Sequence, residues 1–590
     1  MGTGMGTKLK DALRAAGLRS SGDRTQHAER SASPTARVQD DAFTDWLARA
    51  PSTSKAPLRG AAVPTTKSDG GRRLENKRQP DSRPRTEAKI QPAQEPPHRL
   101  VKSGPFRPHD LFLPDPLETT RLPSISLNGI AASLTAEPEN ETDLIVGLDF
   151  GTSSTKVVVR DAYAATSVFP VQLSGQRSGI ESFLLPSRVF KTGSVYSLQH
   201  GTEKISDLKL GLLSCRAASP LNEFNDCCAF LALVIRRTRA WFLTEHHDIY
   251  SRHALNWKLN LGLPARSYEN TAIVQLFRRL AWAAANLAGD SEATDITFEK
   301  ASEWRIRSHE MTKWDNASQS FPAEFGCNDV DVVPEVSAQL QGFMTAARWD
   351  WRTRPVMLLV DVGAGTVDSA LFHVRAPDNG DGQLTFYSSQ VKQNGVMNLH
   401  RARVASLNEM VPSGDEHQDA REYLRSISQA TDRLRPIPES IDQYLPGYQG
   451  MDAGIDTSFQ IDRYRRQVAG CIKDAKVGKG ISVRQLTRVP LLLCGGGSRM
   501  RFYGSIDKLI NNTTGWNVSV ELMKLPVPRD LADSGWHGEE FDRLSVAYGL
   551  SLSGDGERSL GKIVRAIEVP DAESYRPKDT GDRYVSKDQV

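Results

Sequence analysis

The sequence predicts an α/β fold made of two similar lobes, preceded by a long disordered extension. From Asp143 to about Ser553, short apolar runs alternate with helical patterns, which is typical of mixed sheets covered by helices. A unit of strand, Asp, Gly-rich turn and strand occurs at Asp149 and again at Asp361, 212 positions later, and indicates a duplication. The first 140 residues are rich in Pro, Ser, Thr, Arg and Gln and have no sustained apolar period.

The bulk composition excludes some classes of protein. The 590-residue chain has a formal net charge of +3, which gives no reason to expect nucleic acid or an anionic membrane as a partner. Its six cysteines are scattered, fit no metal-ligand spacing and suit a reducing compartment, and adjacent Cys227 and Cys228 are interpreted as core residues. The N-terminus lacks the apolar stretch of a secretory signal, and no run reaches membrane-spanning length. We therefore expect a soluble, cytoplasmic protein.

The changes in composition suggest boundaries. We expect a disordered extension at 1–140, a first lobe at 141–352, a second lobe at 353–553 with an outer subdomain at about 399–486, and a polar tail without strands at 554–590.

Two short helical patterns interrupt the extension, at 7–18 and 40–50. They are either docking peptides for a protein partner or nascent helices without a role, so the extension is one candidate site for such a partner. Residues 51–107 contain thirteen Lys or Arg against five Asp or Glu. Because aromatic residues are not interleaved with these charges, we interpret the run as a solvated linker rather than a nucleic-acid site.

The elements expected in the two lobes follow from apolar periodicity. Strand pairs are predicted at 143–150 with 155–161 and at 355–362 with 369–374, and buried strands near Trp257 and Val489. Helices are predicted at 225–243, 271–289 and 461–475. The stretch from Ser302 to Cys327, with Trp304 and Trp314 among charged residues, is predicted to be a surface excursion.

The first motif with chemical potential is the run Asp149 to Lys156, with the sequence DFGTSSTK. Gly151 lets the backbone turn and approach a ligand without a Cβ in the way. The hydroxyls of Thr152 and Ser153, with the N–H groups of the turn, form a concave nest for phosphate oxygens. Asp149 at the strand end is placed to hold Mg²⁺ through its water shell. An ordinary hairpin with a polar turn is the alternative interpretation.

The second motif is the run Asp361 to Asp368, with the sequence DVGAGTVD. It repeats the strand, the Asp and the Gly-rich turn. We expect Gly363, Gly365 and Thr366 of this turn to contact phosphate oxygens as well. Two such hairpins across a cleft surround a triphosphate with backbone donors and bring two Asp side chains to one cation. The repetition therefore favours a phosphate site over two unrelated turns.

The third motif follows the buried strand near Val489. Gly495, Gly496 and Gly497 come directly after it, and Ser498 and Arg499 come next. Three glycines let a flat ligand lie on the backbone, and a guanidinium group stacks well on an adenine ring. A plain strand-to-helix turn would need fewer glycines.

Taken in this order, the three motifs resemble the phosphate-1, phosphate-2 and adenosine motifs of the actin-like ATPase superfamily, which includes actin, heat-shock chaperones and sugar kinases. The sequences DFGTS, DVGAGTVD and GGGSR are most similar to DLGTT, DLGGGTFD and GGSxR of DnaK-type chaperones. Further similar segments lie at 185–189, 205–209, 333–338 and 544–550, so the resemblance covers roughly residues 143–553. It implies duplicated ribonuclease-H-like domains around a central nucleotide cleft.

The resemblance also implies roles, with ATP and Mg²⁺ as cofactors. Asp149 and Asp361 would organise Mg²⁺ and its waters. Lys209 would reach the γ-phosphate, and Glu335 would orient a water. The remaining residues would contact phosphates, support the loops or hold adenosine: Gly151, Thr152, Ser153, Gly363, Gly365, Thr366, Asp368, Gly495, Gly496, Gly497, Ser498 and Arg499. Lys156 matches a lysine that actins place on the phosphates.

Two positions depart from the chaperone pattern. Ala364 replaces a glycine, and alanine fits there only with a negative φ. Val336 replaces the proline after Glu335, so the turn behind that residue is expected to differ. Both departures call fast hydrolysis into question.

Three functions are compatible with these motifs. The first is a DnaK-like regulatory or chaperone-like ATPase without a peptide-binding domain, in which the nucleotide opens and closes the cleft. The second is an actin-like protein that forms filaments. The third is a small-molecule kinase, which needs a catalytic base and a second-substrate pocket. The Ser-Arg ending at Arg499 favours the first, and the second motif disfavours the kinase.

Overall fold

The computed structural model describes residues 100–108, 120–164, 167–175, 179–214, 221–268, 270–310, 325, 329–346, 356–375, 383–428, 437–451, 453–479, 481–513, 517–531, 538–552 and 561–565. All of these residues belong to one unit of the chain by their contacts. Most of the predicted extension, including the helical patterns at 7–18 and 40–50, lies outside the described residues, as does most of the predicted tail.

A six-stranded sheet forms the first part of the fold. Its central strands β2 (Asn140–Phe150) and β3 (Ser154–Asp161) are antiparallel, and β9 (His253–Leu263) runs parallel to β2. The outer strands are β10 (Val330–Pro334), parallel to β9, and β4 (Val168–Pro170) and β5 (Leu185–Pro186), both antiparallel to β3.

A second six-stranded sheet follows in the chain. Here β11 (Val356–Val362), β12 (Val367–Arg375) and β13 (Gln383–Lys392) form an antiparallel meander. The remaining strands are β15 (Val489–Cys494), parallel to β11, β16 (Val520–Met523), parallel to β15, and β17 (Gly561–Arg565), parallel to β13.

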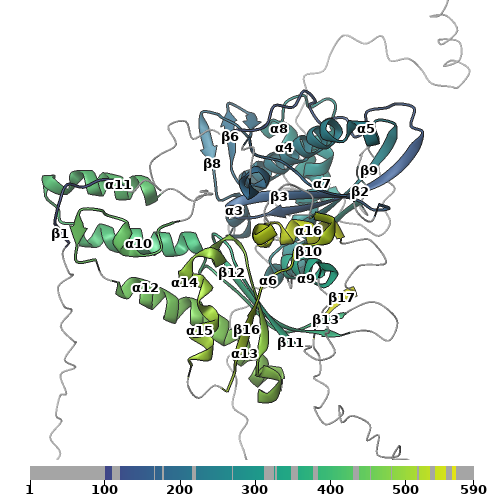
Figure 1. Cartoon of the computed structure of the whole chain (residues 1–590). Coiled ribbons are helices and arrows are strands. Elements are labelled where there is room, and N and C mark those ends of the chain that lie inside the picture. The colour runs from purple at the N-terminus through teal and green to yellow at the C-terminus, as the bar shows by residue number, and fades with distance from the viewer. Residues whose placement is uncertain are drawn as a thin grey trace, which may run out of the picture. The chain divides into compact units, whose positions relative to one another are not determined.

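The two sheets have the same core arrangement. In each, three antiparallel strands are followed in space by two strands parallel to the first, in the orders β10-β9-β2-β3-β4 and β16-β15-β11-β12-β13. Helices cover both faces of the sheets (Figure 1), so the central strands carry apolar side chains on both sides. The predicted mixed α/β class is therefore confirmed.

Three long helices pack together on the first sheet, as Figure 1 shows: α4 (Leu221–Glu245), α7 (Thr271–Gly289) and α8 (Phe298–Glu310). The predicted helix at 271–289 has the observed bounds. It begins there because the Asn270 side chain accepts a hydrogen bond from the Ala272 N–H group. Cys227 and Cys228 are fully buried in α4, as predicted for core residues.

Helices α9 (Glu335–Ala346) and α16 (Ser545–Leu552) lie between the two sheets (Figure 1). Val336, Leu340 and Phe343 of α9 join the core of the second sheet, whereas α16 packs against β2, β3 and β9. The helices approach each other closely at Gly549, where a Cβ would lie 1.7 Å from the Ala338 carbonyl oxygen. This contact joins the two halves of the fold.

The helices of the predicted outer subdomain (399–486) are inserted between β13 and β15: α10 (Val396–Met410), α11 (Gln418–Ser428), α12 (Gly454–Ser458) and α13 (Arg466–Lys479). The helix predicted at 461–475 starts as one stretch of π-helix, Phe459–Arg465, and continues as α13. A smaller three-stranded sheet is inserted in the first half: β6 (Val189–Thr192), β7 (Val195–Ser197) and β8 (Glu203–Ile205), followed by α3 (Leu208–Ser214).

Part of the predicted extension packs on the folded body. Leu100 is buried, and β1 (Val101–Lys102) pairs with β14 (Tyr448–Gln449) in the second half. Residues 120–139 run along the first half, where the Ala132 carbonyl oxygen accepts a hydrogen bond from Trp257 Nε1 at 2.8 Å. The expectation of disorder up to residue 140 is therefore wrong for the described residues 100–108 and 120–139.

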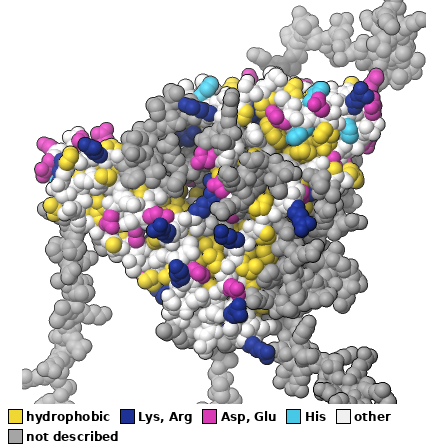
Figure 2. All heavy atoms as spheres, viewed as in Figure 1, with side chains coloured by type: hydrophobic (Ala, Val, Ile, Leu, Met, Phe, Trp, Pro, Cys, Tyr) yellow, Lys and Arg dark blue, Asp and Glu magenta, His cyan; other side chains and the backbone are white. Residues whose placement is uncertain are grey.

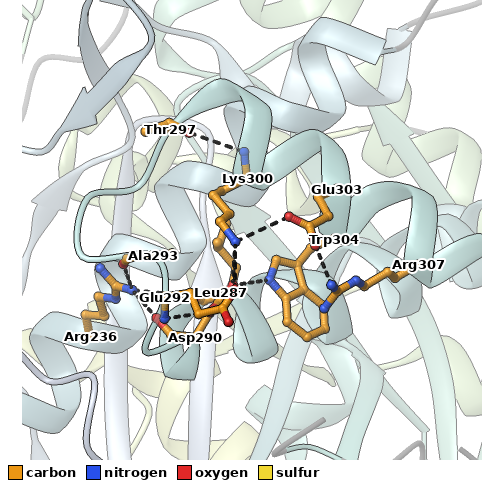
Figure 3. A network of polar contacts seen from close by, with 10 residues as sticks. All are labelled: Arg236, Leu287, Asp290, Glu292, Ala293, Thr297, Lys300, Glu303, Trp304 and Arg307. Atoms are coloured by element: carbon orange, nitrogen blue, oxygen red, sulfur yellow. Dashed lines mark hydrogen bonds and ion pairs between the residues drawn. The ribbon is translucent and has the colours of Figure 1, made fainter. Parts of the chain in front are cut away.

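Figure 3 shows how the segment after α7 is fixed. Arg236 of α4 donates hydrogen bonds to the carbonyl oxygens of five residues: Leu287, Ala288, Asp290, Ala293 and Thr294. These carbonyls lie at or just beyond the end of α7, where the regular helical donors run out, so the guanidinium group caps the helix.

The same network buries Trp304, whose Nε1 donates to Asp290 Oδ2 at 3.0 Å (Figure 3). The ring also packs against Trp282. The predicted surface excursion is thus wrong for residues 302–310, which belong to α8, while Trp314 and Cys327 lie outside the described residues.

Strand β17 lies within the segment predicted to be a tail without strands, so that prediction is wrong for Gly561–Arg565. Within the described part of the chain, no helix is long and apolar enough to cross a membrane. On the face shown in Figure 2, Lys and Arg side chains are scattered among acidic and apolar ones.

Candidate functional site

The first Gly-rich turn connects β2 and β3. Asp149 and Lys156 face each other across the two strands, and Lys156 Nζ lies 2.8 Å from Asp149 Oδ2. A Cβ on Gly151 would lie 2.4 Å from the Ser154 carbonyl oxygen, so only glycine fits this tight turn. The turn therefore presents Asp149 already neutralised by a lysine of its own hairpin.

The second Gly-rich turn connects β11 and β12 with the same register. Asp361 faces Asp368 across the strands, and the Gly363 N–H group closes the turn on the Thr366 carbonyl oxygen at 2.9 Å. Ala364 is not among the described residues with positive φ, so the alanine fits the turn. A Cβ on Gly395 would lie 2.5 Å from the Ala364 carbonyl oxygen, which shows how closely the start of α10 supports the turn.

The triglycine loop leaves β15 directly beside Asp361. Gly495 has a φ of +79°, and a Cβ there would lie 2.2 Å from Asp361 Oδ1. Both the backbone conformation and the contact therefore require glycine. Ser498 Oγ donates to the Gly495 carbonyl oxygen at 2.7 Å, so this side chain closes the loop.

Helix α9 begins where β10 ends and carries two polar side chains to the same place. Glu335, its first residue, lies 2.5 Å from Lys209 Nζ through its Oε1 atom. One turn later, Gln339 Nε2 donates to Asp361 Oδ2 at 2.6 Å. Val336, at the position that departs from the chaperone pattern, is a buried helical residue. Lys209 is only 4% exposed, so it is not a solvated surface lysine.

These elements enclose one cavity of about 680 Å³, a size that suits a small-molecule ligand. Most of the residues predicted from the sequence line it: Asp149, Gly151, Thr152, Ser153, Lys156, Lys209, Glu335, Asp361, Gly363, Thr366, Asp368, Gly495, Gly496, Gly497 and Arg499. Gly365 and Ser498 are not in the lining. Gly365 stands behind it, where a Cβ would lie 3.0 Å from Thr152 Cγ2.

Sequence reasoning missed several lining residues: Glu181, Gln339, Glu439, Glu540, Asp542 and Arg543. Gln339 lies four positions after Glu335, and this helical spacing was a usable signal. The acidic residues belong to distant segments with no motif of their own.

The lining is strongly acidic. Among the described residues it contains eight Asp or Glu and four Lys or Arg side chains. Burial raises the pKa of Asp361 to about 7, with the nearby charge of Glu335 adding to the shift. Burial also raises the pKa of Asp368 well above its usual range, and it raises the pKa of Glu335 although Lys209 opposes that shift. The cavity thus favours protons or a cation.

Three acceptor atoms of the lining lack partners among the described residues: Asp542 Oδ2, beside Arg499, and two atoms in the cluster around Asp361. Asp368 Oδ1 and Gln339 Oε1 are buried and accept no hydrogen bond among the described residues. A buried unpaired acceptor costs about 1–3 kcal/mol, so a bound water, an ion's water shell or a ligand is expected to supply the donor. Both belong to residues that line the cavity.

Arg499, which follows the triglycine loop, also lines the cavity. Its Nη1 and Nη2 atoms lie 2.8 Å from Glu540 Oε1 and 2.9 Å from Asp542 Oδ1, on the short 3-10 helix Gly538–Arg543. Hydrogen bonds to both terminal nitrogens fix the plane of a guanidinium group and leave its faces available for stacking. Met397, Ile437 and Met500 add apolar surface to the lining.

No protein-family model matches this sequence. A comparison with curated proteins likewise gives no match.

Proposed function

We propose that the chain binds ATP together with Mg²⁺ in this cavity and hydrolyses it slowly, as a nucleotide-dependent regulatory or chaperone-like factor. One observation carries the proposal. Three loops that are far apart in the sequence, beginning at Asp149, Asp361 and Gly495, line the same cavity. In the resembling superfamily these loops serve the phosphates, the metal and the adenosine, respectively.

The proposed fold is a pair of ribonuclease-H-like domains of the actin-like ATPase type, most similar to the DnaK-type nucleotide-binding domain. It is supported by the common strand order and directions of the two sheets. The two hairpins add a second correspondence. In each, an aspartate near the end of the first strand, Asp149 or Asp361, pairs with a residue at the same place in the second strand, Lys156 or Asp368.

The cavity residues fit a hydrated Mg²⁺ ion. The excess of carboxylates calls for a cation if a triphosphate is to enter, because the anion alone would be repelled. Waters on a metal ion are hydrogen-bond donors, which the unpaired atoms Asp368 Oδ1 and Gln339 Oε1 lack. Among the described residues no group of three or more His, Cys, Asp or Glu side chains could hold a metal ion. The residues therefore suit an ion that keeps most of its waters, which is the usual state of Mg²⁺.

When bound, Mg²⁺ would neutralise charge on the phosphates. The chain's own residues would do the rest. The turns at Gly151 and Gly363 leave room for a ligand because neither residue carries a Cβ, and Thr152 and Thr366 line the cavity beside them. Lys156 and Lys209 bring positive charge, although each is paired with a carboxylate in this structure.

Hydrolysis needs a group that orients the attacking water. Glu335 is placed for this task at the start of α9, and the Lys209 ammonium beside it can stabilise charge that develops on the phosphoryl group. Because Lys209 must exchange Glu335 for the phosphate, we expect slow turnover.

A regulatory role requires that the nucleotide change the relation between the two halves. Lining residues come from both sheets, so a ligand bridges them. Asp207 before α3 and Arg401 of α10 form an ion pair of 3.6 Å between the halves. Closure around a ligand is the usual response of such a two-part cleft.

Equilibrium binding of ATP, with and without Mg²⁺, tests the proposal directly. Isothermal titration should show ATP binding that Mg²⁺ strengthens, and a phosphate-release assay should show slow turnover. Failure to bind ATP under either condition would overturn the proposal. ATP-dependent pelleting would instead support an actin-like filament, and phosphate transfer to a sugar would support a kinase.

A further inference from the structure

Gln339 belongs to none of the three sequence motifs, yet it lines the cavity beside Asp361. It lies on α9 one turn after Glu335 and is only 1% exposed. Residues four apart on a helix share a face, so both side chains point toward the same space. Glutamine is an unusual residue at such a buried position because it brings one acceptor and two donors that need partners.

The donor side of the amide is used. Gln339 Nε2 donates to Asp361 Oδ2 at 2.6 Å. The other oxygen of the same carboxylate lies against Gly495, where a Cβ would come within 2.2 Å of Oδ1. The Asp361 carboxylate is thus held between the amide and the glycine backbone, and its orientation is fixed.

The acceptor side of the amide is not used. Gln339 Oε1 is buried and accepts no hydrogen bond among the described residues. Gln341, two positions further along α9, offers a contrast: it is buried as well, but its Nε2 donates to the Leu552 carbonyl oxygen at 3.2 Å, away from the cavity. Of the two glutamines on α9, the one with a buried oxygen that lacks a partner among the described residues is the one that lines the cavity.

We propose that Gln339 is a positioning residue of the ATP site, which fixes Asp361 through its amide N–H group and accepts a hydrogen bond from a water of the hydrated Mg²⁺ through its amide oxygen. The inference rests on the proposed function. It deepens that proposal by assigning to α9 a contact with the metal shell in addition to the contact of Glu335 with Lys209.

The chemistry of the ligand determines which group can donate a hydrogen bond to the amide oxygen of Gln339. Phosphate oxygens of ATP are acceptors and cannot satisfy an amide oxygen, whereas metal-bound water and the ribose hydroxyls are donors. Gln339 contacts Asp361, the residue expected to organise the metal, which favours the water. Inorganic pyrophosphate has no ribose, so its Mg²⁺-dependent binding separates the two donors.

The experiment compares Gln339→Met, which keeps the size of the side chain but removes both hydrogen-bonding functions, with the matched control Gln341→Met. ATP and pyrophosphate are titrated calorimetrically with Mg²⁺ and with EDTA. Removing a partner from a metal's outer shell typically weakens metal binding about 10–100-fold. We expect Gln339→Met to reduce, by about that factor, the increase in affinity that Mg²⁺ gives to both ligands. The affinities measured in EDTA should change little. Gln341→Met should leave the gain as in the wild type.

A gain from Mg²⁺ that is unchanged in Gln339→Met would overturn the inference while leaving the proposed function intact. An effect on ATP but not on pyrophosphate would assign the amide oxygen to a donor of the adenosine, either a ribose hydroxyl or the adenine amino group, and also overturn it. A wild-type protein that binds neither ligand would overturn the proposed function itself. Gln339→Asn, whose amide is one methylene shorter, serves as a second variant if the methionine variant does not fold, with the same expected loss.

Discussion

The two Gly-rich hairpins have turns of the same length and the same pairing register. The residue that pairs with the aspartate is positively charged in the first hairpin and acidic in the second. In the first, Asp149 faces Lys156 at 2.8 Å, so the acid is neutralised within its own hairpin. In the second, Asp361 faces Asp368, and burial raises the pKa of both. The comparison shows that the same hairpin frame carries two electrostatic arrangements: the first hairpin contains its own counter-charge, whereas the second places two acids opposite each other.

The hairpins also differ in what supports them. Behind the second hairpin, Gly495 approaches Asp361 so closely that a Cβ would collide with the carboxylate. The first hairpin is bounded instead by β5 and the residue after it, Ser187, whose Oγ lies 2.9 Å from Thr155 Oγ1.

The largest effect is expected at this close approach. Gly495→Ala combines a φ of +79° with a Cβ 2.2 Å from Asp361 Oδ1. An unfavourable φ alone costs about 1–3 kcal/mol, and the collision adds to it. Chemical denaturation should show this loss of stability, whereas Gly496→Ala next to it, where the nearest atom would be 3.5 Å away, should be nearly neutral. Equal losses in both variants would contradict the geometry described for Gly495.

The opposite charges of the hairpins predict opposite responses to neutralisation. Lys156→Met leaves the buried Asp149 without its cation, which should destabilise the ligand-free protein by about 1–3 kcal/mol. Asp368→Asn removes a buried acid from an acidic cluster, so the ligand-free protein should become more stable at pH 8. Thermal unfolding of both variants checks the difference. The same sign for both would show that the facing charge does not distinguish the hairpins.

The pH dependence of stability should come from the second hairpin. The pKa of Asp361 is about 7 in the folded protein against a usual value of 3.8. A raised folded pKa means that its contribution is fully present below pH 3.8 and is lost as the pH rises through 7. Unfolding of the wild type should therefore become easier between pH 5 and pH 8 relative to Asp361→Asn. A difference between the two proteins that does not vary with pH would contradict this assignment.

The smallest effect is expected from Ala364→Gly, which introduces the glycine found in the resembling chaperones. Since Ala364 is not among the described residues with positive φ, glycine gains nothing there and loses more backbone entropy on folding. We expect a loss of about 0.5–1 kcal/mol in denaturant unfolding, with ATP affinity unchanged. A gain in stability would show that the second turn is strained.

The sequence was sufficient for those features that repeat a local pattern. Apolar runs gave the central strands, helical periodicity gave α7 with its observed bounds, and the spacing of Asp149 and Asp361 gave the two hairpins. Three of the motif glycines, Gly151, Gly495 and Gly497, were also predictable because each marks a point where a Cβ would collide.

Features that depend on tertiary contacts were not predictable. Residues 120–139 are held largely through backbone carbonyls, such as Ala132 bonded to Trp257, and carbonyl positions leave no trace in a side-chain pattern. Trp304 looked exposed among charged neighbours, but Asp290 and Trp282 bury it. The contact between Gln339 and Asp361 depends on how α9 packs beside β11, which the sequence pattern does not show.

The central claim is that the two hairpins act on one metal–triphosphate, and a double-mutant cycle tests it most directly. Mg·ATP affinity is measured for the wild type, Asp149→Asn, Asp361→Asn and the double variant. Residues that share a ligand shell show coupling energies of about 0.5–3 kcal/mol, so we predict that the double variant loses clearly less than the sum of the single losses. Losses that add within experimental error, or single variants that bind Mg·ATP as the wild type does, would contradict the claim.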